Sequence, residues 1–487
     1  MVFSSITFLF FFLPAILLLY PFAGKWQNAL LLAASLLFYT WGEGIYLGVL
    51  LVSIAINYLA GRVIGVYIGR DMDDPPNDSS DGKPHAAGVT LMLAIVANFA
   101  LLGFYKYANF LTDNLNWLLS HLAMPSVSLA PVHPPLGISF FTFQAVAYLI
   151  DIYRGQVTAG RRFTDFALFL SFFPRLAAGP IVRYGDMAAA LKSRTITAEN
   201  YAAGIERFVF GLAKKVLLAN PLGQTADRIY ALSLTDLSCP LAWLAAICYM
   251  LQIYFDFSGY TDMAIGLGRM FGFRLPENFN YPYIARGIQE FWRRWHITLS
   301  SWFLDYLYIP LGGNRRGPVR TYAHLLIVFL LCGLWHGANW TFILWGLYHG
   351  FFIVCEHLAK PLTIRPPSWL ARPATIVIVM IGWVLFRCDT LSQALNHIAV
   401  MFGQAKASGG IDPFIDRKFL CELAAATALA MPLWPWLRQQ WGHFSSDSWP
   451  WALVALSCRT LGLAALLGAV IASVAAGSYN PFIYFRF

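Results

Sequence analysis

The chain has 487 residues, of which 58% are hydrophobic and only 12% are charged. A globular domain carries about 25% charged residues, so this composition excludes a soluble protein and indicates a polytopic membrane protein. The formal net charge of +9 is typical of cytoplasmic loops beside anionic lipid and does not call for a nucleic-acid partner.

The apolar residues are grouped in a way that predicts helical spans. Backbone groups in hydrocarbon must be hydrogen-bonded internally, so a span is a helix or part of a closed barrel. A barrel strand alternates polar and apolar residues, whereas this chain has solid apolar blocks such as residues 6–20 and 90–105. None of the seven cysteines forms a CxxC pair, and they are expected to be small core residues rather than metal ligands.

The first apolar stretch, residues 2–24, is predicted to be a retained span. A secretory signal peptide has a basic start, a shorter apolar core and a small-residue cleavage site, and this stretch has no Lys or Arg before it. Apolar segments follow at about 27–42 and 45–61. A polar composition rich in Asp, Pro, Ser and Gly predicts a loop over 69–88.

The next predicted span covers about 88–105, and Lys106 is expected to mark its end. Cytoplasmic loops carry an excess of Lys and Arg. Basic residues occur at Lys25, in the 62–83 region and at 154–162, whereas residues 107–153 contain no Lys or Arg. Five crossings fit this distribution if the N-terminus lies outside the cytoplasm.

The remaining apolar segments lie at about 163–180, 205–222, 238–258, 321–335, 338–358, 373–387, 417–436 and 451–476. A crossing needs about 20 residues, so several of these segments are too short to span the membrane. Short apolar pieces with Pro or Gly are typical of re-entrant or broken helices, and the piece "FFPRLAAGPI" at 172–181 fits this description. We predict one membrane unit of roughly ten to thirteen helices, without a soluble domain.

The block from Gly259 to Arg320 differs from the rest of the chain. Its eight arginines place it on the cytoplasmic side, and its closely spaced aromatic residues suit a membrane interface. An interfacial helix that only anchors the chain would explain both features. It would not explain the acidic residues, His296 and the paired glycines at 312–313, so a surface through which a substrate reaches a site is favoured.

His336 lies in an apolar run, "LCGLWHGANW", 16 residues after Arg320. A helix from Arg320 rises about 24 Å over that distance, so His336 is expected deep in the membrane. An ionisable group at that depth is a functional hypothesis, and a neutral histidine bonded to a neighbouring helix is the alternative. Gly333 and Gly337 would allow another backbone or a ligand to come close.

The other histidines are weaker candidates. His349, in "LYHG", is the most suggestive of those in apolar segments. No HExxH, GxSxG or GxxxxGK[ST] motif is present, so a zincin-type metal site, a nucleophile elbow and a phosphate-binding loop have no support.

Several long runs resemble the membrane-bound O-acyltransferase (MBOAT) family, and within it the bacterial branch that O-acetylates exported polysaccharides such as alginate. The strongest similarity is carried by residues 254–285, 291–317 and 330–350, which contain "FWRRWHITLSSWF" and "LWHGANW". The runs at 135–155, 172–183, 210–220 and 481–487 agree with it. The resemblance implies N-terminal helices in 1–134, a signature core in 135–360 and C-terminal helices in 361–487.

The resemblance also implies a fold, an activity and a site. The fold would be a ring of tilted helices around a thinned centre, with re-entrant or interfacial helices and a central tunnel. The activity would be transfer of an acyl group from a cytoplasmic thioester to a hydroxyl, with His336 and His296 as the catalytic histidines. The expected substrate-binding residues are Arg293, Arg294, Trp295, Asp305, Asn314, Trp335 and Asn339.

An imidazole is well matched to removing the hydroxyl proton, and it can also carry an acyl group covalently, so both roles stay open for His336. The arginines near His296 could attract a phosphate-bearing donor, either acetyl-CoA or an acyl-carrier phosphopantetheine thioester; no bound cofactor or metal is expected. We expect a bacterial inner-membrane protein that contacts lipid and periplasmic polysaccharide-modification partners. A D-alanyl transferase of the teichoic-acid type and an acyl conduit that serves a separate periplasmic transferase are the alternatives.

Overall fold

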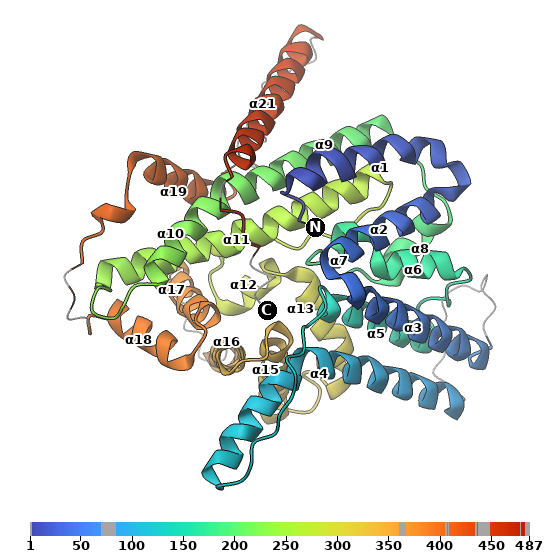
Figure 1. Ribbon diagram of the computed structural model, residues 1–487, viewed down its shortest axis with the longest axis horizontal. Coiled ribbons are helices and arrows are strands. Elements are labelled where there is room, and N and C mark those ends of the chain that lie inside the picture. Colours follow the sequence, from blue (N-terminus) through green and yellow to red (C-terminus); the bar gives the residue numbers. More distant parts are fainter. Residues whose placement is uncertain are drawn as a thin grey trace. The chain divides into compact units, whose positions relative to one another are not determined.

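The computed structural model describes residues 2–69, 84–359, 367–404, 407, 409–433, 436, 449–477 and 479–482. Every regular element in these ranges is a helix, which confirms the predicted all-α class (Figure 1). Most of the predicted polar loop at 69–88 lies outside the described residues. The chain divides into two compact units, which are described separately here. The first unit comprises Met1–Tyr201, Leu267–Pro276 and Trp302–Leu307, and the second comprises Ala202–Gly266, Glu277–Ser301 and Tyr308–Phe487.

The first unit contains the N-terminal helices. They are η1 (Phe8–Phe12), α1 (Leu13–Leu19), η2 (Tyr20–Trp26), α2 (Gln27–Glu43), η3 (Gly44–Tyr46), α3 (Leu47–Tyr67), α4 (His85–His121), α5 (Ile138–Arg154), α6 (Phe163–Ser171), α7 (Phe173–Leu176) and α8 (Tyr184–Lys192). Gly24 and Gly44 have positive φ angles of 47° and 53° and bend the chain between successive helices.

Most of the helices that follow belong to the second unit. They are α9 (Ala198–Ala213), η4 (Lys214–Ala219), α10 (Asn220–Tyr230), α11 (Cys239–Met270), η5 (Pro282–Ile284), α12 (Ile288–Arg294), α13 (Ile297–Phe303), η6 (Leu304–Tyr308), α14 (Ile309–Leu311), α15 (Pro318–His336), α16 (Trp340–Ala359), α17 (Ser368–Arg387), α18 (Leu391–Met401), η8 (Asp412–Phe414), α19 (Arg417–Leu429) and α21 (Trp449–Ala475). Three of them, α9, α11 and α13, run across a boundary between the units, and η6 lies almost wholly in the first unit.

Seven helical stretches of the described chain are long and apolar enough to cross a membrane. They are Phe8–Tyr67, His85–His121, Cys239–Met270, Pro318–His336, Trp340–Ala359, Ser368–Arg387 and Leu456–Ala475. The first of these stretches joins six successive helical elements, from η1 to α3, so the seven stretches are not a count of helices. The predicted ten to thirteen helices stay a prediction.

Two helices continue past the predicted apolar segments. Lys106 does not end its helix, because α4 continues to His121. Residues 107–121 contain no Gly or Pro to break the helix, and the Lys106 ammonium donates to Ser139 Oγ at 3.1 Å on α5. Likewise, the predicted segment at 238–258 continues as α11 to Met270, so the first part of the polar block at 259–320 belongs to a long helix.

The predicted re-entrant piece at 172–181 lies in the first unit and consists of a short helix followed by a buried non-helical segment. After α6 and the short α7, the chain becomes non-helical and stays buried. A Cβ on Gly137, at the start of α5, would lie 2.2 Å from the Leu176 carbonyl oxygen at the end of α7. The returning chain brings Arg183 over the ring of Tyr306, whose hydroxyl donates to Asp151 near the other end of α5. The chain therefore runs along α5 in one direction and returns in the other.

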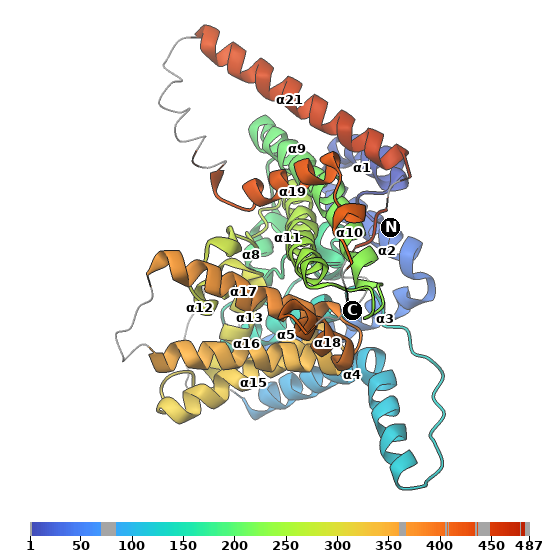
Figure 2. The same ribbon diagram turned by 90° about the vertical axis from the view of Figure 1, so that its left-hand side faces the viewer.

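Helices α15 and α16 pack side by side over their length (Figure 2). A Cβ on Gly333 would lie 2.3 Å from the Phe342 carbonyl oxygen, and one on Gly346 would lie 2.2 Å from that of Phe329. Both glycines therefore allow the two backbones to touch, as the sequence predicted for Gly333. This contact fixes the end of α15, where His336 lies.

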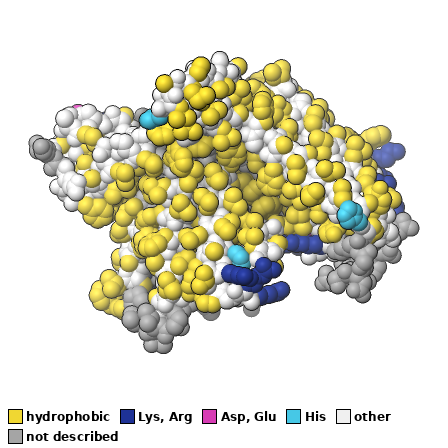
Figure 3. All heavy atoms as spheres, turned by 90° about the horizontal axis from the view of Figure 1, so that it is seen from below, with side chains coloured by type: hydrophobic (Ala, Val, Ile, Leu, Met, Phe, Trp, Pro, Cys, Tyr) yellow, Lys and Arg dark blue, Asp and Glu magenta, His cyan; other side chains and the backbone are white. Residues whose placement is uncertain are grey.

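The surface of the described chain suits a lipid environment. Hydrophobic side chains predominate on the face shown in Figure 3, and Lys and Arg gather at its margin. Large side chains of α3 and α4 such as Leu59, Val66 and Leu93 are more than half exposed. Such surface is unfavourable in water and costs little among lipid tails. The chain is a multi-pass membrane protein; the ring and the central tunnel stay predictions.

Candidate active site

His296 lies between the short helices α12 and α13 in the second unit. Its side chain is fully buried, and its φ angle of +45° is uncommon for a residue with a Cβ. The start of α12 is fixed by Glu356 on α16, whose carboxylate accepts hydrogen bonds from the N–H groups of Ile288 and Gln289. A negative charge is favourable at a helix N-terminus, so Glu356 sets the position of the helix that leads to His296.

Asn278 contacts His296 from an extended segment that follows α11. Its side-chain Oδ1 lies 3.3 Å from His296 Nδ1, and it accepts hydrogen bonds from the N–H and the hydroxyl of Thr298 at 3.1 and 3.0 Å. Its carbonyl oxygen accepts from the N–H of Ile297 at 3.0 Å. One fully buried asparagine thus satisfies the first donors of α13 and also contacts the imidazole.

His336 is the last residue of α15 and is buried. Its ring contacts three aromatic residues at centroid distances between 4.9 and 5.3 Å: Trp335, Trp345 on α16 and Phe386 on α17. The helix ends because Gly337 is extended, and this ending turns the chain toward α16. The predicted helical rise from Arg320 to His336 is confirmed, since both residues lie on α15.

The structure brings the two predicted catalytic histidines together. The ring centroids of His296 and His336 are 6.4 Å apart, and Trp335 lies 5.9 Å from His296. Both imidazoles belong to the second unit although 40 positions separate them in the sequence. A buried pair of this kind can hold a hydroxyl and an acyl carbonyl close to two imidazoles.

Burial controls the charge of His296. Desolvation lowers the pKa of its imidazole to about 3, because a charged ring is poorly stabilised away from water. His296 is therefore neutral at physiological pH and carries a single ring proton. A neutral imidazole keeps one lone pair with which to accept a proton or a hydrogen bond.

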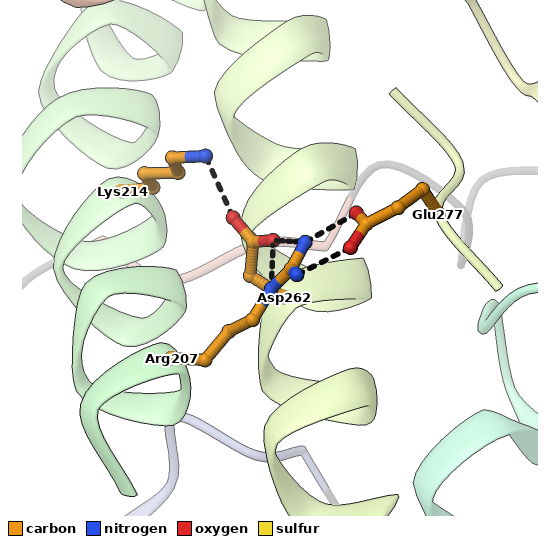
Figure 4. A network of polar contacts seen from close by, with 4 residues as sticks. All are labelled: Arg207, Lys214, Asp262 and Glu277. Carbon is orange, nitrogen blue, oxygen red and sulfur yellow. Dashed lines mark hydrogen bonds and ion pairs between the residues drawn. The ribbon is translucent and has the colours of Figure 1, made fainter. Parts of the chain in front are cut away.

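A network of charges holds the segment that carries Asn278 (Figure 4). Arg207 on α9 donates to Asp262 on α11 at 2.7 and 2.9 Å and to both carboxylate oxygens of Glu277 at 2.5 Å. Lys214 donates to the other oxygen of Asp262 at 2.6 Å. Glu277 is the residue before Asn278, so the network fixes the backbone next to the asparagine.

The aromatic residues predicted for substrate binding lie in the same core. Trp295 is buried against Trp383 on α17 and stacks with Phe291 at a centroid distance of 5.7 Å. Trp335 is buried and contacts the rings of both His296 and His336. Their role as substrate-binding residues stays a prediction, and their packing around the histidines is compatible with it.

The polar residues predicted for substrate binding are more dispersed. Arg293 is exposed, and Arg294 pairs with Glu290 at 2.8 Å. Asn314 is exposed and accepts from Tyr308. Asn339 donates to the Asp389 carbonyl at 2.8 Å and accepts from the N–H of Thr341 in the first turn of α16.

Asp305 belongs to the first unit, where its carboxylate pairs with Arg183 and its carbonyl accepts from Arg154 at 3.1 Å. These partners give Asn339 and Asp305 clear structural roles.

Sequence reasoning missed Asn278, Glu356 and the Arg207 network. Asn278 belongs to "PENFNYPY", which the resemblance includes, but its contact with His296 spans 18 residues and has no local signal. Glu356 lies within the segment at 338–358, which was predicted only as an apolar helix. Among the described residues, no three His, Cys, Asp or Glu side chains are grouped so that they could hold a metal ion.

Comparison with known proteins identifies the family. The model of the MBOAT, membrane-bound O-acyltransferase family matches residues 161–388. The probable alginate O-acetylase AlgI of Azotobacter vinelandii is 45% identical over 82% of this chain and 78% of that protein. The chain belongs to the membrane-bound O-acyltransferase family.

Two further relatives extend the similarity over the whole sequence. The probable alginate O-acetylase AlgI of Pseudomonas aeruginosa is 38% identical, with complete coverage of both chains. The peptidoglycan O-acetyltransferase of Helicobacter pylori is 34% identical over all of this chain and 98% of that protein. This membrane-bound O-acyltransferase is therefore an enzyme that transfers acyl groups to oxygen, and His296 and His336 both lie in the region that the family model matches.

Proposed function

We propose that this enzyme takes an acetyl group from a cytoplasmic thioester and passes it across the bacterial inner membrane for O-acetylation of an exported polysaccharide. The observation that carries the proposal is the buried pair of His296 and His336, found in a chain whose full-length relatives are named for O-acetylation of alginate and peptidoglycan. Alginate is the first polysaccharide to test.

The path of α15 supports transfer across the membrane. The helix begins beside the basic residues Arg315, Arg316 and Arg320, which the positive-inside rule assigns to the cytoplasmic side. His336 closes the helix about 24 Å further along its axis. An acyl group that reaches His336 has therefore moved through most of the hydrocarbon thickness.

The chemistry requires removal of one proton and its return. In the proposed step the acceptor hydroxyl oxygen attacks the thioester carbonyl, and His336 takes the hydroxyl proton. The carbon–sulfur bond then breaks, and the proton passes to the departing thiolate. The covalent alternative places the acetyl group on His336 before the hydroxyl attacks, with the same overall balance.

The role of His336 is tested by His336→Ala in purified, folded enzyme. We expect acetyl transfer to fall by at least about 100-fold, because general-base catalysis typically contributes 10²–10⁴-fold. His324→Ala is the matched control, since His324 lies on the same helix and bonds to the Gly313 carbonyl; it should retain turnover. Near wild-type activity of folded His336→Ala would falsify the assignment.

Donor and direction are tested in sealed vesicles with labelled thioester outside and oligosaccharide acceptor inside. Label from acetyl-CoA or from an acetylated carrier protein identifies the donor class. Transfer of D-alanine instead of acetyl would assign the teichoic-acid type of reaction. Label that crosses without an acceptor would assign the conduit function, with the final transfer made by a separate periplasmic enzyme.

A further inference from the structure

The amide of Asn278 has only one orientation that satisfies its partners. The backbone N–H of Thr298 can only donate, and it points to the Asn278 side chain at 3.1 Å. The atom at that position must therefore be the amide oxygen, because the amide nitrogen would bring two donors together. The same oxygen faces Nδ1 of His296 at 3.3 Å.

This orientation determines which ring nitrogen of His296 carries hydrogen. An amide oxygen is only an acceptor, so Nδ1 must be the donor. Burial keeps the imidazole neutral by lowering its pKa, so no second proton occupies Nε2. Nε2 lies at the opposite edge of the ring and keeps its lone pair.

We propose that Asn278 is a positioning residue that fixes His296 as the Nδ1–H tautomer and thereby presents Nε2 as an acceptor in the acyl-transfer site. The proposal deepens the proposed function and rests on it for the catalytic use of Nε2. The tautomer itself follows from the hydrogen bonds alone.

Polar contacts hold the residues that precede and follow Asn278 in the sequence. The Arg207 network clamps Glu277, the preceding residue (Figure 4). Two residues further on, the N–H of Asn280 donates to the Arg294 carbonyl at 2.9 Å, and the Arg294 guanidinium donates to the Asn280 carbonyl at 3.1 Å. The asparagine is thus fixed relative to α12, whose end leads directly to His296, so its bond to the ring is a property of the assembled unit.

Burial, and not a neighbouring charge, determines the protonation state of His296. From α11 its ring contacts Phe257, and from α15 it faces Trp335 and the titratable His336. The charged groups on the nearby segments, Glu277 and Arg294, are engaged in their own ion pairs. Desolvation alone accounts for the lowered pKa of His296, so a charge placed at position 278 should be felt by the ring.

The tautomer is measured directly by ¹⁵N NMR of enzyme with labelled histidine, with His296→Gln used for assignment. We expect Nδ1 to carry hydrogen and Nε2 to give an unprotonated signal at neutral pH. A protonated Nε2 would overturn the proposal. This readout does not depend on the substrate, so it stands even if the enzyme proves to transfer a group other than acetyl.

Two variants separate positioning from helix capping. Asn278→Ala should lower kcat by about 10- to 100-fold with little change in KM, the range found when a metal-binding histidine loses the partner that orients its ring. Thr298→Val removes one bond to the same oxygen and leaves the His296 contact, so it should keep the tautomer and most of kcat. Equal losses of kcat in both variants with an unchanged tautomer would show that Asn278 is only a cap.

Asn278→Asp keeps every acceptor and serves if the alanine variant does not fold. The new carboxylate favours the imidazolium form of His296, so its pKa rises and activity is lost sooner as the pH falls. We expect the pKa of the His296 imidazole, followed by ¹⁵N NMR, to move up by at least about one pH unit. A pKa of His296 identical to that in the wild type would reject the proposal.

Discussion

His296 combines a left-handed backbone, complete burial and a hydrogen bond at Nδ1. A non-glycine residue in this conformation costs about 1–3 kcal/mol and persists only where its surroundings determine it. Asn278 supplies that determination through its bonds to Ile297 and Thr298, the two residues after the strained one. The hydrogen bonds at the start of α13 therefore offset the conformational free energy of the left-handed backbone, and they hold the His296 ring in one place.

The burial of His296 predicts a pH-dependent stability. The folded protein keeps this ring neutral down to its pKa of about 3, whereas the unfolded chain takes up a proton below about pH 6.5. Acid thus favours the unfolded state: the contribution is complete above pH 6.5 and is lost as the pH falls toward 3. The free energy of unfolding should decrease by about 1.4 kcal/mol per pH unit from this residue.

The measurement compares unfolding in detergent between pH 7 and pH 5 for wild type and His296→Gln. The variant should show a shallower pH dependence by that amount. His85→Gln changes an exposed histidine at the start of α4 and should leave the wild-type slope. If His296→Gln and wild type had parallel slopes, the ring would have to be charged or hydrated in the folded protein.

Single residues were predictable where the sequence places an unusual group in an unusual setting. His336 stood out because an imidazole in an apolar run is costly, and His296 because a family motif surrounds it. Asn278 could not be found in this way, because a polar residue in a polar block is ordinary and its partner is 18 residues away. Asp305 and Asn339 were expected to bind substrate, and the structure gives both of them protein partners.

At the level of elements, the packing of α15 on α16 positions the site. Gly333 is one turn before His336, and Gly346 is next to Trp345, which contacts the His336 ring. Because each glycine touches the opposite backbone, the distance between the helices also sets the distance between His336 and its aromatic enclosure.

Gly346→Ala should separate these helices. The added methyl would meet the Phe329 carbonyl oxygen at 2.2 Å, and overpacking of this kind costs about 1–3 kcal/mol. Both the melting temperature in detergent and acyl transfer should fall. Gly468→Ala is the control, because Gly468 lies within α21 with nothing near its Cβ position; comparable effects in the two variants would contradict the packing argument.

Helices were predicted well where apolar residues run without interruption. The predicted segments at 321–335 and 338–358 correspond closely to α15 and α16. The breaks between α5 and α10 were less predictable, because long apolar runs there are divided by tertiary contacts such as that of Gly137 with Leu176. Hydropathy reports where lipid or core surrounds the chain, and it does not report where a buried helix must turn.

At the scale of the whole molecule, the second unit encloses a buried ion pair. Lys215 lies 2.9 Å from Asp256, and their side chains are 3% and 1% exposed. Lys215 also donates to Asn220 at 2.7 Å and to the carbonyl of Pro481. The chain around Pro481 is fixed further by Phe482, which stacks on Tyr260 at a centroid distance of 4.9 Å.

Removal of one partner of this pair should be costly. Lys215→Met leaves Asp256 as an uncompensated buried charge, and such a change typically costs about 3–5 kcal/mol. Unfolding in detergent should therefore start at a much lower temperature, and Lys215→Met combined with Asp256→Asn should recover part of the loss. Lys192→Met, at the exposed end of α8, should have little effect; a similarly small effect at Lys215 would argue against a charged pair.

The contact between Lys215 and Pro481 has a consequence for how the protein is made. The two residues are 266 positions apart, so α9, η4 and α10 leave the ribosome long before the carbonyl that completes the lysine's set of acceptors. Asp256 becomes available with α11, and residues 479–482 follow after every helix described here has been synthesised. Insertion of the spans therefore does not complete the second unit. The unit reaches its final state only when residues 479–482 pack beside the Lys215 ammonium group.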